Sequence, residues 1–174
     1  MRIAAKASRV CVTFAIIISF QYFFWSEIAT AYPVKADKVV VIKSKRILLL
    51  MKEGEIIKAY RVVLGKQPEG PKVQSGDKKT PEGTYILDSR EAKSKFHLSI
   101  HVSYPNESDV MKARKSGVSP GGEIMIHGLP NGLGGLGKLH RYYNWTNGCI
   151  AVTNDEIEEI WQMVKDGTPI EIKP

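Results

Sequence analysis

Short runs of hydrophobic residues, separated by turn signals, make up most of the chain after its first thirty residues. The clearest run is 96–103, where hydrophobic residues at even positions alternate with polar residues at odd positions, as in a strand with one buried face. Other runs are stretches of valine, isoleucine and leucine bounded by glycine, proline or charged turns. Together they predict strands at 38–44, 46–51, 56–64, 83–87, 96–104, 124–126, 148–152 and 168–172.

Two segments carry the signals of short helices. Asn106 can cap a helix that ends near Ser116, before Gly117. Thr153 with Glu156 three residues later makes a capping box for a second helix. The apolar residues on one side of this second helix are Ile157, Ile160, Trp161 and Val164. Because strands and helices do not alternate along the chain, the pattern predicts a mainly β fold, a sandwich or barrel with two short helices.

Two long segments lack a hydrophobic period. Residues 68–79 form a loop rich in glycine, proline and lysine, and residues 128–144 form a second loop that contains five glycines. A long loop of this kind inside a compact domain is usually functional.

The N-terminus has the pattern of an export signal. Three basic residues precede an uncharged run at 10–25, and the small-x-small sequence at 29–31 predicts cleavage after Ala31. The competing interpretation is an uncleaved N-terminal anchor, which the aromatic cluster at 22–25 would suit. Both interpretations leave one domain at 32–174 and place it in the periplasm or cell envelope.

The net charge of +7 falls to +5 without residues 1–31, because three basic residues and one acidic residue leave with them. The basic residues are scattered and no groove-binding motif is found, so the sequence does not indicate a nucleic-acid partner. The lysines expected at a solvated surface are Lys43, Lys45, Lys52, Lys58, Lys78, Lys79 and Lys93.

The cysteines and histidines supply the candidate chemistry. Cys11 lies in the expected signal, so Cys149 is left as a lone thiol, either a nucleophile or a buried structural residue. His127 ends one short strand and Cys149 begins another, and an imidazole beside a thiol can accept its proton. Gly148 allows a tight turn that gathers backbone N–H groups into an oxyanion hole. His140 with this pair suggests zinc, but no fourth ligand is found, so no metal is expected.

The surroundings of this pair resemble the signature of the L,D-transpeptidase (YkuD-domain) family, which reads His-Gly, a spacer, and Ser/Thr-His-Gly-Cys. The corresponding residues here are His127-Gly128 and Thr146-Asn147-Gly148-Cys149. The segments GDKKTPEGT at 76–84 and YPN at 104–106 are also similar to the family, and the resemblance covers about residues 38–173.

The resemblance implies a catalytic domain at 32–174 with the family's β-sandwich or barrel. It implies that Cys149 is the nucleophile, that His127 is the base and that the carbonyl of Gly128 orients the imidazole. The backbone N–H groups of Asn147, Gly148 and Cys149 would form the oxyanion hole, and residues 129–144 would form a lid over the peptide stem. The residues expected to contact the substrate are Arg141, Tyr142, Trp145 and Thr146.

Two positions depart from the family pattern. Asn147 stands where a second histidine is usual, and Ala151 stands where an arginine is frequent. Arg141 or Lys138 from the lid is a candidate to replace that arginine. These variations resemble the YafK-like subgroup, some of whose members hydrolyse peptidoglycan bonds instead of joining them.

The implied reaction is attack on the meso-diaminopimelate carbonyl of a peptidoglycan stem peptide, followed by transfer of the acyl group to an amine. With water as acceptor, the enzyme would be a carboxypeptidase or a hydrolase that detaches a peptidoglycan-bound lipoprotein. No cofactor is needed, and the membrane is contacted only through an uncleaved N-terminal segment. A non-catalytic peptidoglycan-binding module and a secreted cysteine protease are the further alternatives.

Overall fold

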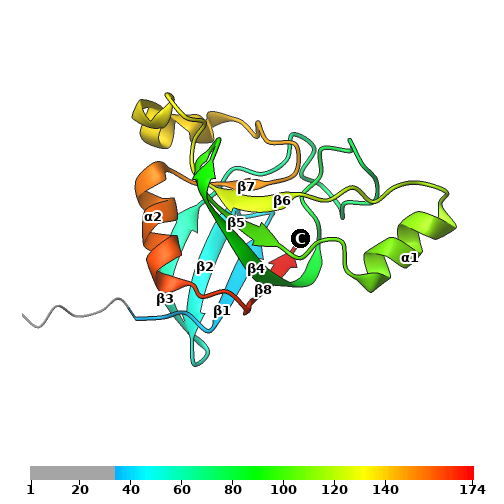
Figure 1. The fold of residues 1–174 in the computed structure, drawn as a ribbon, viewed down its shortest axis with the longest axis horizontal. Coiled ribbons are helices and arrows are strands. Elements are labelled where there is room, and N and C mark those ends of the chain that lie inside the picture. The colour runs from blue at the N-terminus through cyan, green and yellow to red at the C-terminus, as the bar shows by residue number, and fades with distance from the viewer. Residues whose placement is uncertain (1–33) are drawn as a thin grey trace, which may run out of the picture. The chain divides into compact units, whose positions relative to one another are not determined.

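Within residues 34–174, which the computed structural model describes, eight strands hydrogen-bond into a single mixed sheet (Figure 1). The strands are β1 (Lys38–Ile42), β2 (Ile47–Lys52), β3 (Glu55–Arg61), β4 (Gly83–Ser94), β5 (His97–Val102), β6 (Ile124–His127), β7 (Ile150–Ala151) and β8 (Thr168–Lys173). Their order in the sheet is β3-β2-β1-β8-β4-β5-β6-β7. The β1–β8 and β6–β7 pairs are parallel, and the other pairs are antiparallel.

The sheet curls until its two ends meet. Val63, just after β3, forms an antiparallel bridge with Ala151 of β7, although β3 and β7 stand at opposite ends of the strand order. The two residues exchange both backbone hydrogen bonds, at 2.9 and 2.8 Å. This closure satisfies backbone groups that an open edge would leave to solvent, and it sets the start of β7 against the segment that follows β3.

In the described part of the chain, three helices accompany the sheet: α1 (Glu107–Lys115), α2 (Asn154–Met163) and the 3-10 helix η1 (Gly134–Tyr142). Helix α2 packs along one side of the curled sheet (Figure 1), and Ile157 and Ile160 are fully buried in the common core. From the strands, Val39, Leu48 and Leu87 are equally buried. Burying one such side chain contributes about 1.5–3 kcal/mol, so the strands and α2 stabilise one core.

The mainly β fold predicted from the sequence is confirmed, as are both helix starts. Asn106 caps α1 and Thr153 caps α2, and each belongs to a capping box, with Asp109 and Glu156 respectively. In each box the cap side chain accepts a backbone N–H and the acidic side chain accepts the N–H of the cap residue. The predicted signal peptide, residues 1–31, lies outside the described residues.

Three local predictions are wrong. Strand β4 continues to Ser94 instead of ending at Leu87, because its polar second half pairs with β5 through two register shifts. Ser99 was expected on a solvent face but is buried, where its hydroxyl lies 2.6 Å from that of Ser94. The glycine-rich loop contains η1, which is kinked at Gly137 with φ 46°.

None of the helices in residues 34–174 combines the length and the apolar character needed to cross a bilayer.

Candidate active site

His127 is the last residue of β6, and the carbonyl group of the next residue holds its ring. The imidazole Nδ1 lies 2.7 Å from the carbonyl oxygen of Gly128. Because a carbonyl oxygen only accepts hydrogen bonds, Nδ1 carries the proton and Nε2 is left as an acceptor. This is the tautomer that a general base requires.

The ring of His127 is shielded from solvent by aromatic side chains. His127 is 3% exposed, and the ring centroids of Phe96 and Trp145 lie 4.4 and 5.7 Å from the centroid of its imidazole. Burial lowers the pKa of His127 to about 4, an effect that the Gly128 carbonyl opposes and that His140 reinforces. The imidazole is therefore neutral at neutral pH and free to accept a proton.

Cys149 lies one residue before β7 and is partly buried. Its Sγ is 3.5 Å from the backbone oxygen of Glu123, so the weak S–H donor is directed to a carbonyl. Burial raises the pKa of the thiol above its usual value, against the opposing effects of the Met125 N–H and the charge of Lys72. A thiol in this state attacks a carbonyl only after a base has taken its proton.

The sheet register places the segment that contains Cys149, directly before β7, next to the strand of His127. His127 pairs with Ala151 in the parallel β6–β7 ladder, so Cys149 lies two residues back along the adjacent chain. From strand spacing and rise, such positions have Cα atoms about 8 Å apart, with side chains on the same face where the chain is extended. Ala151 itself is fully buried and paired with Val63. The position where the family frequently has arginine therefore faces the interior here.

Gly148 allows the loop before Cys149 to pass close to a neighbouring backbone. Its φ is +135°, and an added Cβ would lie 2.7 Å from the carbonyl oxygen of Lys79 and 3.1 Å from Ile124 Cδ1. Gly65 also packs closely against a neighbouring backbone, since an added Cβ would lie 2.2 Å from the carbonyl oxygen of Lys78. Both positions require glycine.

Thr146 is buried and stabilises this loop through its hydroxyl. Its hydroxyl donates to the carbonyl oxygen of Cys149 at 2.7 Å and accepts the N–H of Gly148 at 3.2 Å. One of the three N–H groups expected in an oxyanion hole thus has an acceptor within the loop, while the Asn147 residue is exposed. The oxyanion hole stays a prediction, and so does a substrate contact from Thr146.

Asn154, at the first position of α2, links the chain that follows Cys149 to the chain that follows His127. Its Oδ1 accepts the N–H of Leu129 at 2.9 Å. A Cβ on Gly128 would lie 2.8 Å from the same oxygen, so glycine is needed for this approach. The contact fixes the chain directly after the carbonyl that holds His127.

The predicted lid is attached to α2 by charge. Arg141 Nη2 lies 2.6 Å from both carboxylate oxygens of Glu156, which also accepts the N–H of Thr153. Burial raises the pKa of Glu156, but its contacts with Arg141 and Thr153 hold it below the usual value. The guanidinium is thus engaged at the helix start, and a substrate contact from Arg141 stays a prediction.

The remaining lid residues divide between the interior and the solvent. His140 is buried, and Trp145 Nε1 donates to its Nδ1 at 3.4 Å. Tyr142, in contrast, is 82% exposed. Trp145 therefore belongs to the wall around His127, whereas Tyr142 has no part in it in this conformation.

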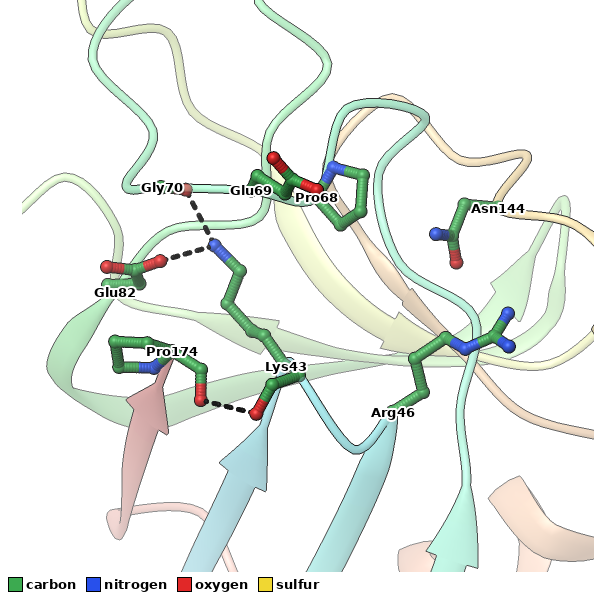
Figure 2. Close-up of a pocket in the computed structure, with 9 residues that line it drawn as sticks. Lys43, Arg46, Pro68, Glu69, Gly70, Glu82, Asn144 and Pro174 are labelled. Carbon is green, nitrogen blue, oxygen red and sulfur yellow. Dashed lines mark hydrogen bonds and ion pairs between the residues drawn. The ribbon is translucent and has the colours of Figure 1, made fainter.

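A pocket of about 370 Å³ lies at the base of the loop 70–80. In Figure 2 the Lys43 side chain extends beside it toward Gly70 and Glu82, and Arg46 and Asn144 lie on its other side. The Lys43 ammonium donates to the carbonyl oxygens of Gly70 and Thr80 at 2.7 and 2.8 Å and to Glu82 at 2.8 Å. The expectation that Lys43 is solvated is wrong, because these acceptors compensate for its burial. Cys149 and His127 do not line this pocket.

The sequence pattern missed two residues near the nucleophile. Lys72 and Asp77 form an ion pair of 2.8 Å with side chains only 4% and 10% exposed. Asp77 lies in the segment that resembles the family, whereas Lys72 precedes it and carries no motif.

Within residues 34–174, no cluster of three or more histidine, cysteine, aspartate or glutamate side chains has the arrangement of a metal site.

Comparisons with known proteins identify the relatives of this chain. YafK of Escherichia coli (strain K12), which bears the name of an L,D-transpeptidase, is 31% identical to this chain over 132 residues. The matched residues cover 72% of this chain and 46% of YafK. The crystal structure of the helical cell shape determining protein Pgp2 from Campylobacter jejuni has a TM-score of 0.62 at 27% identity, covering 82% of this chain and 50% of Pgp2. The structure of Bd1075 from Bdellovibrio bacteriovorus has a TM-score of 0.53 at 29% identity, covering 80% of this chain and 48% of Bd1075.

The chain spans about half the length of these relatives. Residues 36–172 of this chain match the model of the YkuD family, described as the L,D-transpeptidase catalytic domain. The match includes both His127 and Cys149. The chain belongs to the YkuD family of L,D-transpeptidase catalytic domains.

Proposed function

We propose that this chain is a cysteine-dependent L,D-transpeptidase that acts on peptidoglycan stem peptides in the periplasm or cell envelope. The observation that carries the proposal is the hydrogen bond from His127 Nδ1 to Gly128, which leaves Nε2 as a base beside the strand of Cys149. Neutral histidine and protonated thiol form the resting state that both pKa shifts favour.

In the proposed reaction, His127 Nε2 takes the thiol proton as Sγ attacks the meso-diaminopimelate carbonyl. The tetrahedral oxyanion would be stabilised by backbone N–H groups of the loop 147–149. As the C–N bond breaks, the imidazolium returns its proton to the leaving amine, and a thioester remains on Cys149. An acceptor amine then loses a proton to His127, forms the new amide and regenerates the thiol.

A hydrolytic reaction is the second candidate, with water as acceptor. The exposed Asn147 and the buried Ala151 favour it, because the site lacks the imidazole and guanidinium that the family pattern frequently supplies there. Water needs less positioning than an amine acceptor, so a site with fewer polar side chains near the thioester suits hydrolysis. In that case the protein would remove a stem residue or detach a bound lipoprotein.

Product analysis separates these candidates. The chain and its Cys149→Ala variant are incubated with purified tetrapeptide muropeptides and with lipoprotein-linked sacculi, and the products are identified by mass spectrometry. Cross-linked dimers that depend on Cys149 would establish a transpeptidase. Loss of the terminal residue, or lipoprotein release without dimers, would establish the hydrolase. Binding to sacculi without any product would leave a non-catalytic module and refute the proposal.

A further inference from the structure

The loop 70–80 is anchored at its base. Lys43, 3% exposed in its side chain, donates to the carbonyl oxygens of Gly70 and Thr80, the two ends of the loop. It also donates to Glu82, and Figure 2 shows the contacts with Gly70 and Glu82. Each bond is 2.7–2.8 Å long. A charged donor that reaches both ends of a loop restricts their separation, so the loop behaves as a fixed part of the domain.

Inside the loop, one carboxylate organises the backbone around a buried ammonium. Asp77 accepts the Lys72 ammonium at 2.8 Å and the backbone N–H groups of Val73, Gln74 and Lys79 at 2.8–3.1 Å. Burial raises the pKa of Asp77, but Lys72 and these N–H groups hold it below the usual value. Lys72 also donates to the carbonyl oxygen of Gln74 at 2.9 Å. An ammonium has three donors, so these contacts account for two of them.

The loop contacts two segments that adjoin the nucleophile. On one side, the carbonyl oxygens of Lys78 and Lys79 lie against Gly65 and Gly148 so closely that no Cβ fits. On the other side, the Ser75 N–H donates to the carbonyl oxygen of Ser119 at 2.7 Å, in the segment that leads to Glu123. The Cys149 thiol contacts that segment through the Glu123 carbonyl. The ammonium of Lys72 is therefore buried in a loop that packs against the residue before Cys149 and against the segment that leads to Glu123.

We propose that Lys72 is a positioning residue of this site, whose buried ammonium, fixed by Asp77, supplies the positive charge that stabilises the Cys149 thiolate. This inference rests on the proposed thiol chemistry and adds a residue to it. It requires no substrate, since the thiolate forms in the free protein whenever a base takes the proton.

Electrostatics explains why the charge is needed. Transfer of the thiol proton to His127 creates a thiolate and an imidazolium in a site where burial opposes both charges. The charged groups that act on the thiol are Glu123, before β6, and Lys72 on the loop, while His140 acts on His127 from the lid. Of these, Lys72 favours the thiolate and Glu123 disfavours it.

The test is the pH dependence of Cys149 alkylation. The full chain is treated with iodoacetamide across a range of pH, and the label on the Cys149 peptide is quantified by mass spectrometry. Lys72→Met is expected to move the rate profile to higher pH and to slow alkylation at pH 7 by roughly tenfold, as removal of a nearby charge does at an effective dielectric constant of about 20. Lys72→Arg keeps the charge and is expected to stay within about twofold of the parent.

Asp77→Asn distinguishes an electrostatic role from a structural one. It breaks the same ion pair but removes the negative charge and keeps the ammonium. Because the remaining positive charge stabilises the thiolate, the alkylation profile is expected to move to lower pH. If the pair only held the loop in shape, Lys72→Met and Asp77→Asn would move the profile in the same direction. That result, or an unchanged profile in folded Lys72→Met, overturns the proposal.

Urea unfolding and circular dichroism identify the variants that remain folded. If Lys72→Met does not fold, the direction of the Asp77→Asn shift decides the matter by itself: lower pH supports the inference and higher pH overturns it. Failure of the proposed function is a different result, in which peptidoglycan products are missing while the alkylation profiles still respond to charge.

Discussion

Replacing His127 with glutamine removes a buried imidazole whose protonation opposes folding. The imidazole of the unfolded chain binds a proton at about its ordinary pKa of 6.5, and that of folded His127 at about 4. Because the folded-state pKa is the lower one, its contribution to stability is complete above pH 6.5 and is lost as pH falls toward 4. At about 1.4 kcal/mol per unit, the loss reaches about 3 kcal/mol by pH 4.

Urea unfolding of the parent and of His127→Gln at pH 7 and pH 4 measures this contribution. Other groups titrate over the same range, so the relevant quantity is the difference between the two proteins in the stability each loses. We expect the parent to lose about 3 kcal/mol more than the variant. His97→Gln, at a position that reaches solvent beside Glu158, is the matched histidine control. Equal losses in the parent and His127→Gln would refute a buried neutral imidazole.

Three further substitutions test the surroundings of the site. Gly148→Ala adds a methyl group 2.7 Å from a backbone oxygen at a φ of +135°, so we expect a loss of about 2–5 kcal/mol in urea unfolding; parent-like stability would contradict the close approach. Lys43→Met leaves the partly buried Glu82 carboxylate without its cation and is expected to cost about 3–5 kcal/mol, whereas Lys45→Met at a nearby exposed position should change stability by less than about 0.5 kcal/mol. Arg141→Ala removes a 2.6 Å ion pair and should speed amide hydrogen exchange in η1, while Lys138→Ala should not; equal rates in both would mean that the pair does not hold the lid.

Much of the fold follows from local sequence signals. Alternation along 96–103 and the valine-rich run of β1 predict strands because their side chains must face one core, and Thr153 with Glu156 predicts the start of α2 through its capping geometry. Strand β4 extends further than predicted because its polar half is stabilised by pairing with β5, a contact that the local pattern does not contain. Pairing between distant segments decided that boundary.

The site was predictable where a residue acts through its own chemistry. Cys149 and His127 are recognisable as a thiol and an imidazole at the ends of short strands, and Gly148 as a flexible position before the thiol. Lys43 and Lys72 were not recognisable, because a lysine gives no local sign that carbonyl and carboxylate groups will surround it. Their burial depends on acceptors that the fold gathers from residues 70–82, so only the structure identifies them.

The central claim is that Cys149 becomes acylated by a peptidoglycan stem peptide with His127 as base. The most direct measurement is mass spectrometry of the protein after brief incubation with a purified tetrapeptide stem and an acid quench, with the adduct located by peptide mapping. We predict a mass increase equal to the acyl tripeptide on the Cys149 peptide, strongly reduced in His127→Gln and missing in Cys149→Ala. Turnover of the stem by Cys149→Ala, or an adduct on another residue, would contradict the account.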